Sequence, residues 1–203
     1  MIRPGGAPNR AVEMAYRVLI RLQVTALPVD PLAILRRCAD TAIMTQQEAA
    51  TQLDCSLEML EKTMRHADAV TFRQETQGSV RYLVVYREGG NPARLQFTLA
   101  HELGHRLLHT GEGTAEEEAE ADCFASHLLC PRPALHGLLM RAPTLTAGQV
   151  SRLMYVSSAA ASLLSRNELV PVRDEIWAQV EAQLRDWARC VTIPEAQKGE
   201  WPI

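Results

Sequence analysis

The chain has 203 residues, of which 47% are hydrophobic and 22% are charged. This ordinary globular composition excludes a disordered, collagen-like or coiled-coil protein, and the length suits one domain with, at most, a small helical annex. The formal net charge is −3 at pH 7, so the chain gains little from neutralising phosphates and nucleic acid is not the expected partner. The sequence has no run of 18 apolar residues, which excludes a membrane-spanning helix.

The first third of the chain combines helical and extended patterns. Three helices are expected there, at residues 8–25, 32–38 and 56–65. The pattern then changes, because residues 69–73 and 80–87 are rich in Val, Tyr and Phe. These two segments predict two antiparallel strands of a small sheet.

Capping signals mark the helices in the middle of the chain. Asn91, an N-cap followed by proline, predicts a helix that runs to His109. Thr114 and Glu117 have the spacing of a capping box, so another helix is expected to start there and to stop before Pro131. Three more helices are expected further on, at residues 146–155, 158–168 and 172–190.

The clearest chemical signal is an HExxH sequence inside the helix that starts after Asn91. Its two histidines, His101 and His105, are four residues apart, so both imidazoles project from one face and can share one metal ion. Glu102 follows the first histidine directly, where it can accept the proton of an attacking water. This arrangement predicts a hydrolytic zinc site.

Zinc needs a third protein ligand, which the spacing of the residues leaves open. His109 lies eight residues after the first histidine, which is about 12 Å of helix, so these two cannot reach one ion. The next helix offers five carboxylates, at Glu116, Glu117, Glu118, Glu120 and Asp122. Glu118 and Asp122 share one face, which suits a ligand followed by a carboxylate that accepts a hydrogen bond from a ligand histidine. Glu117 and Glu120 remain alternatives, and the acidic run also fits a solvated helix face.

Four further side chains are candidates to stabilise an oxyanion or to contact a substrate. They are His109, His127, Tyr82 and Tyr86. For each of them, simple packing or an ordinary hydrogen bond is the alternative. The predicted active site therefore lies on the HExxH helix and on the acidic helix that follows it.

Cysteine usage bears on the compartment. The chain has five cysteines, an odd number, and no CxxC pair. This pattern fits free thiols in a reducing cytosol better than a disulfide framework or a cysteine-ligated zinc. The N-terminal residues also lack the apolar segment of a signal peptide, so a cytoplasmic location is expected.

Several motifs occur in an order typical of one family. They are, in chain order, Arg94, FTLAHELGH at 97–105, His109, EAEADCFA at 118–125 and LLCP at 128–131. The chain resembles the ImmA/IrrE family of zinc metallo-endopeptidases in these motifs, over roughly residues 10–170. It departs from the family at Cys130, where methionine is usual, and at Leu163, where arginine is usual.

The resemblance implies a fold, a metal site and a partner. The fold would be gluzincin-like and α+β, with a small antiparallel sheet, the HExxH helix and flanking helices. Zinc would bind to His101, His105 and Glu118, and Glu102 would be the general base. Family members commonly cut a DNA-binding repressor of the XRE type encoded beside them, in mobile elements, phages or stress responses.

The function expected from the sequence is thus a cytoplasmic zinc endopeptidase that cleaves a helix-turn-helix repressor and relieves repression. An extended segment of the substrate would pair with an edge strand near 69–73 or 80–87. The alternative is a non-catalytic regulator that binds a repressor or another protein stoichiometrically. Glu102 argues against this alternative, because a pure binding protein has no need for a base.

The chain is expected to comprise a metallopeptidase domain with N-terminal helices over residues 1–143 and a helical C-terminal extension over 144–203. The helix pair at 146–168 is similar to a small helix-turn-helix, which raises the alternative of a DNA-binding regulator. The net charge of −3, and only Arg152 and Arg166 within that pair, argue against direct nucleic-acid binding.

Overall fold

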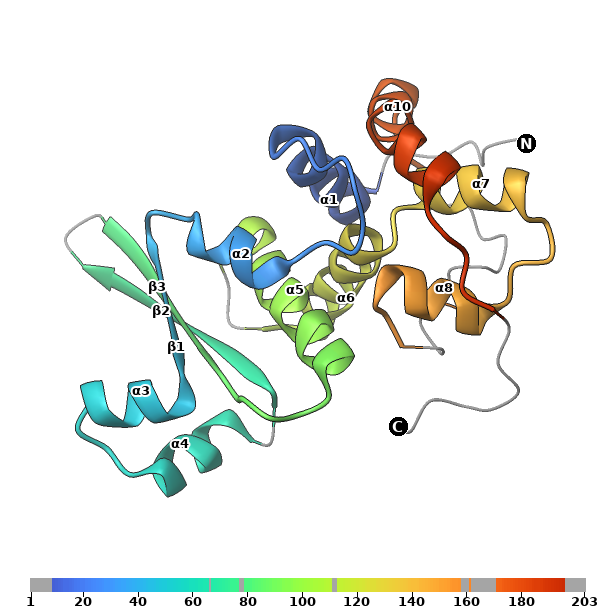
Figure 1. The fold of residues 1–203 in the computed structure, drawn as a ribbon. Coiled ribbons are helices and arrows are strands. Elements are labelled where there is room, and N and C mark those ends of the chain that lie inside the picture. The colour runs from blue at the N-terminus through green and yellow to red at the C-terminus, as the bar shows by residue number, and fades with distance from the viewer. Residues whose placement is uncertain are drawn as a thin grey trace.

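The computed structural model describes residues 9–65, 67–76, 79–110, 113–157, 161 and 171–195. These residues form an α+β fold in which a small sheet, with two short helices on one side, adjoins a larger helical body (Figure 1). The strands are β1 (Thr41–Thr45), β2 (Ala69–Thr76) and β3 (Ser79–Tyr86). The helices of the described residues are α1 (Arg10–Arg21), α2 (Pro31–Arg36), α3 (Gln46–Gln52), α4 (Leu57–Met64), α5 (Pro92–Leu108), α6 (Ala115–Leu129), α7 (Arg132–Arg141), α8 (Ala147–Met154) and α10 (Asp174–Cys190).

The sheet has the strand order β1-β3-β2. Strand β2 pairs antiparallel with β3, with Ala69 opposite Tyr86, which confirms the predicted antiparallel pair. Strand β1 pairs parallel with β3, with Thr41 opposite Tyr82, so the sheet is mixed rather than purely antiparallel. Because β3 is central, β2 lies at an edge of the sheet.

The two faces of the sheet pack on different helices because side chains alternate along each strand. Val84 of β3 belongs to the main hydrophobic core together with Leu99 of α5. Its neighbour Val85 points the other way, into a small second core with Leu60 and Met64 of α4. The sheet is therefore packed between α5 on one face and the α3–α4 pair on the other.

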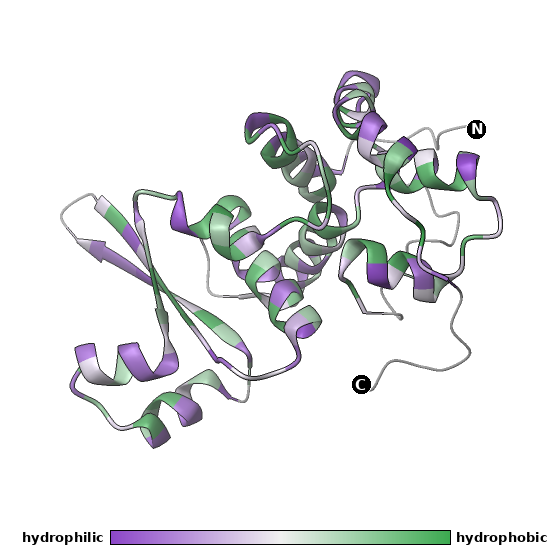
Figure 2. Cartoon of the chain, in the orientation of Figure 1, coloured by the Kyte–Doolittle hydropathy of each residue, from purple (hydrophilic) through white to green (hydrophobic). Residues whose placement is uncertain are grey.

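Helix α5 lies at the centre of the molecule and packs against α6 along its length (Figure 1). Hydrophobic residues cover much of α1, which packs on the other side of α6 (Figure 2). Tyr16 of α1 is fully buried, and its ring stands edge-on to the ring of His127 on α6. These contacts fix α6 between α1 and α5.

The helix starts follow the sequence signals closely. Asn91 caps α5, and Thr114 and Glu117 form a capping box at the start of α6. Helix α7 was not predicted, because Pro131 and Pro133 suggest an interruption, whereas proline is tolerated in the first turn of a helix. The helix predicted at 158–168 lies outside the described residues, save Ala161.

The C-terminal helix α10 packs against α7 and α1. Arg173, at its N-terminal end, donates hydrogen bonds to the buried carboxylate of Glu13 on α1, including one of 3.0 Å from its backbone N–H. The division of the chain near residue 143 stays a prediction. In the part of the chain that the structure describes, we find no helix with both the length and the apolar character needed to cross a membrane.

Candidate metal centre

Three side chains from α5 and α6 converge on one point. The Nε2 atoms of His101 and His105 lie 2.9 Å apart. The two carboxylate oxygens of Glu118 lie 3.3 Å from Nε2 of His101 and 3.2 Å from Nε2 of His105. Two imidazoles and one carboxylate, with their ligand atoms within 4.8 Å of one another, form a donor set that fits a zinc ion.

The convergence depends on a close approach of α5 and α6 at Gly104. A Cβ atom on this glycine would lie 3.1 Å from Cδ1 of Phe124 and 3.2 Å from Cα of Ala121. Leu99 and Leu103 bury the opposite side of α5. As a result the histidine face of α5 is turned toward the first turns of α6, which carry Glu118.

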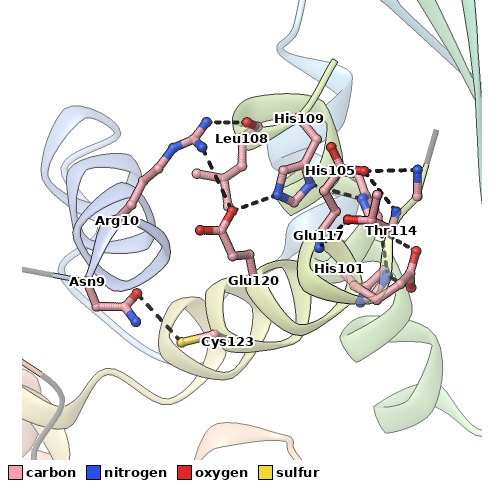
Figure 3. Close-up of polar contacts among 12 residues, drawn as sticks. Asn9, Arg10, His101, His105, Leu108, His109, Thr114, Glu117, Glu120 and Cys123 are labelled. Carbon is pink, nitrogen blue, oxygen red and sulfur yellow. Dashed lines mark hydrogen bonds and ion pairs between the residues drawn. The ribbon is translucent and has the colours of Figure 1, made fainter. Parts of the chain in front are cut away.

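The other acidic candidates of α6 are engaged elsewhere. The Oε2 atom of Glu117 accepts hydrogen bonds from the backbone N–H groups of Gly113 and Thr114, at 2.9 and 3.0 Å. The Oε2 atom of Glu120 lies 2.9 Å from Nε2 of His109 (Figure 3). The carboxylate that faces both histidines is that of Glu118.

The outer ring nitrogens of the two histidines also have partners. Nδ1 of His101 lies 2.8 Å from Oδ1 of Asp122, so the structure places this carboxylate where it can accept the predicted hydrogen bond. Nδ1 of His105 lies 3.1 Å from Nδ1 of His109. Each contact turns an Nε2 atom toward the point where Glu118 lies.

A cleft of about 370 Å³ opens beside these residues, between α5 and the edge strand β2. Glu102 of α5 lines it together with Thr71 of β2. Burial raises the pKa of Glu102 above its usual value, and Thr71 and His101 partly offset the rise. A carboxylate with a raised pKa is suited to accept a proton and to return it.

The electrostatic environment of His105 also suits a metal ligand. Burial, together with the neighbouring His101, lowers the pKa of His105. The lowered pKa favours the neutral imidazole, which is the form that binds a metal. The donor set therefore requires no proton to be removed from His105 near neutral pH.

The structure separates the four further candidates into two pairs. Tyr82 and His109 line the cleft, whereas His127 and Tyr86 do not. His127 is 4% exposed, and its Nδ1 donates a hydrogen bond to the backbone oxygen of Cys123, at 2.8 Å. Burial lowers the pKa of His127 to about 4. Tyr86 lies in the main core beneath the sheet. Neither His127 nor Tyr86 therefore contacts the point of convergence.

Two arginines of the cleft were missed by reasoning from the sequence. Arg106 lies four residues after Glu102 on the same helical stripe, and its guanidinium is 5.4 Å from the centre of the Tyr82 ring. Arg73 follows Thr71 by two residues on the same face of β2. The helical and strand periodicities could have found both, since each continues from a residue of the cleft.

Comparison with known proteins places the chain in a family. Residues 36–161 match the model of the Peptidase M78 family, described as an IrrE N-terminal-like domain. The match covers more than half of the chain, which therefore belongs to this family of metallopeptidases, and the resemblance to ImmA/IrrE proteins is confirmed. Searches of curated proteins and of solved structures gave no significant match. The helices α1 and α10 lie outside the matched residues.

Proposed function

We propose that this protein is a zinc-dependent endopeptidase. The observation that carries the proposal is the convergence of His101, His105 and Glu118 beside the half-buried side chain of Glu102. Two histidines and one glutamate are the protein ligands of many hydrolytic zinc sites, which keep a further position open for substrate or water. Membership of a metallopeptidase family supports the same activity.

The residues of the chain have distinct roles in this proposal. Zinc, when bound, supplies Lewis acidity that polarises a peptide carbonyl and lowers the pKa of water. Glu102 accepts a proton from the attacking water as the carbon–oxygen bond forms. It then delivers this proton to the amide nitrogen as the carbon–nitrogen bond breaks. Asp122 orients His101 through the hydrogen bond that its carboxylate accepts from Nδ1.

The edge strand β2 is the proposed docking site for the substrate backbone. The central strand β3 is already paired on both sides, whereas β2 pairs with β3 alone among the described strands. Thr71 and Arg73 of β2 line the cleft. An extended peptide added to this edge would run past Glu102, and the target must therefore offer an unfolded or linker segment.

The proposed substrate is a helix-turn-helix repressor of the XRE type, which the family resemblance implies. A limited cut in an exposed segment of the repressor would relieve repression. The proposed location is the cytoplasm. All five cysteines are free, which supports a reducing compartment.

Co-expression with the repressor encoded beside the gene tests this function. Three forms of the chain are compared: wild type, Glu102→Gln, and Glu116→Gln as a control at an exposed position of α6. We expect one new repressor fragment with the wild type and the control, and an intact repressor with Glu102→Gln. An intact repressor that leaves its DNA equally with all three forms would contradict proteolysis and favour stoichiometric binding.

A further inference from the structure

The two histidines of the candidate metal centre are supported in different ways. The outer nitrogen of His101 faces a carboxylate, that of Asp122. The outer nitrogen of His105 instead faces the Nδ1 atom of a third imidazole, His109, at 3.1 Å. Two such nitrogens form a hydrogen bond only when one carries a proton and the other does not.

The direction of this bond follows from the metal site proposed above, on which the inference rests. With Nε2 of His105 directed at the metal, the neutral ring carries its proton on Nδ1. His105 is then the donor, and Nδ1 of His109 is the acceptor. His109 in turn carries its own proton on Nε2.

The surroundings of His109 match this tautomer. Its Nε2 atom lies 2.9 Å from Oε2 of Glu120, and an ionised carboxylate is an acceptor only. The side chain of His109 is 6% exposed, so water has little access to replace these partners. The two contacts of the ring therefore specify one orientation and one tautomer.

The contacts from His105 to His109 and from His109 to Glu120 form a hydrogen-bond relay. This relay ends on α1, at Arg10 (Figure 3). One guanidinium nitrogen of Arg10 lies 3.9 Å from Oε2 of Glu120. Another donates a hydrogen bond to the backbone oxygen of Leu108, a carbonyl left without an intrahelical partner at the end of α5. Arg10 thus lies against both α5 and α6 and balances the charge of Glu120, although it belongs to a helix outside the matched family region.

We propose that His109 and Glu120 are positioning residues for His105, and that Arg10 supplies the charge at the end of this relay. The relay fixes the Nδ1–H tautomer of His105 and the direction of its Nε2 lone pair. It does for His105 what Asp122 alone does for His101. Neither His109 nor Glu120 contacts the metal.

Zinc affinity is the first test, because it does not depend on catalysis. Partners of this kind change metal affinity by about 10–100-fold. Chelator competition should show such a loss in His109→Phe, which keeps a ring but lacks the acceptor, and in Glu120→Ala. Glu120→Gln should recover much of the affinity, because its amide oxygen still accepts from His109. Glu116→Ala, at an exposed position of the same helix, should bind zinc like the wild type.

The outcomes separate the relay from the proposed function. Wild-type affinity in both His109→Phe and Glu120→Ala, with zinc bound by the wild type, would overturn the relay alone. A wild-type protein that binds no zinc would overturn the relay and the proposed function together. Thermal unfolding of the metal-free chains shows whether a loss of affinity arises from a loss of fold, which a structural role would cause.

The tautomer itself is the second test, and it needs no substitution. Imidazole nitrogen NMR of the zinc-loaded wild-type protein reports which ring nitrogen carries each proton. We expect the proton of His105 on Nδ1 and that of His109 on Nε2. A proton on Nδ1 of His109 would overturn the relay, since this nitrogen could not then accept from His105.

Discussion

Glu102 is half-buried in the cleft, and this burial raises its pKa. A substitution can separate the chemistry of this residue from its packing. Glu102→Gln keeps the shape of the side chain but removes the proton acceptor. We expect the variant to keep its zinc and its thermal stability while the cleavage rate falls by about 100-fold or more. Metal content and cleavage rate, measured on one preparation, check this. A zinc-loaded variant that cleaves at a near-normal rate would remove Glu102 from the mechanism.

Asp122 lies 2.8 Å from Nδ1 of His101 and is not among the three converging ligand groups. Asp122→Ala should therefore weaken zinc binding by about 10–100-fold without removing a ligand. Chelator competition measures the change, with Glu116→Ala of the same helix as the matched control. Unchanged affinity would reduce Asp122 to a surface residue of α6.

His127 predicts a pH dependence of stability. Burial lowers its pKa to about 4, whereas a histidine in an unfolded chain titrates near 6.5. As the pH falls below 6.5, the unfolded chain binds this proton before the folded chain does, so stability is lost as the pH falls toward 4. The loss from this one group is about 2 kcal/mol between pH 7 and pH 5.

Urea unfolding of the metal-free protein at these two pH values measures the effect. His127→Leu removes the group, so the variant should lose about 2 kcal/mol less than the wild type over the same interval. The comparison is between slopes, because carboxylates contribute to both chains. Equal pH dependence in the two chains would mean that His127 titrates normally in the folded state.

Some ligands of the candidate metal centre could be predicted from the sequence, and others could not. A spacing of four on a helix is enough to place His101 and His105 together. Glu117, Glu118 and Glu120 differ only in their direction around α6, which depends on how α6 packs against α5. The capping box of Glu117 is a local signal and could have excluded that residue as a ligand. The four-residue spacing of Glu118 and Asp122 favours Glu118 over Glu120, but only the packing of α6 against α5 shows which of them faces the histidines.

At the scale of elements, the close contact between α5 and α6 at Gly104 constrains how these two helices pack. A Cβ atom there would meet a backbone atom, Cα of Ala121, at 3.2 Å, which cannot move without shifting α6. Gly104→Ala should therefore destabilise the fold by about 1–3 kcal/mol, although alanine favours helix. It should also weaken zinc binding, because α6 carries Glu118.

Gly148→Ala on α8 is the control for this prediction. A Cβ atom at Gly148 would meet only Oγ1 of Thr146, at 4.0 Å, so this substitution should leave stability unchanged or raise it. Denaturant unfolding and chelator competition measure both variants. A Gly104→Ala protein as stable as the Gly148→Ala protein would show that α5 and α6 can move apart to fit the added methyl group at no cost in stability.

Strand β1, which the sequence did not predict, depends on a distant partner. Strand β1 has five residues, and its register is set by parallel pairing with β3, where Thr41 lies opposite Tyr82. A strand so short has little periodicity of its own. The antiparallel pair of β2 and β3 and the capped helices α5 and α6 were predictable, because neighbouring residues carry their signals.

At the scale of the whole molecule, α1 and α10 pack together although they lie near opposite ends of the chain. The backbone N–H of Asn9 donates to the backbone oxygen of Pro171, at 2.8 Å. The side-chain nitrogen of Gln183 on α10 donates to the backbone oxygen of Leu19, at 2.8 Å. These contacts hold α1 on α10, and α1 in turn brings Arg10 to Glu120. The sequence predicted each helix but not this pairing, because no local pattern joins segments so far apart.

Metal content tests the central claim most directly. Elemental analysis of the purified chain should give about one zinc per wild-type molecule and per Glu116→Ala control, because the donor set binds one ion. His101→Ala and Glu118→Ala should each give far less than one zinc after dialysis against a weak chelator. Zinc retained at the wild-type level in both His101→Ala and Glu118→Ala would contradict the account.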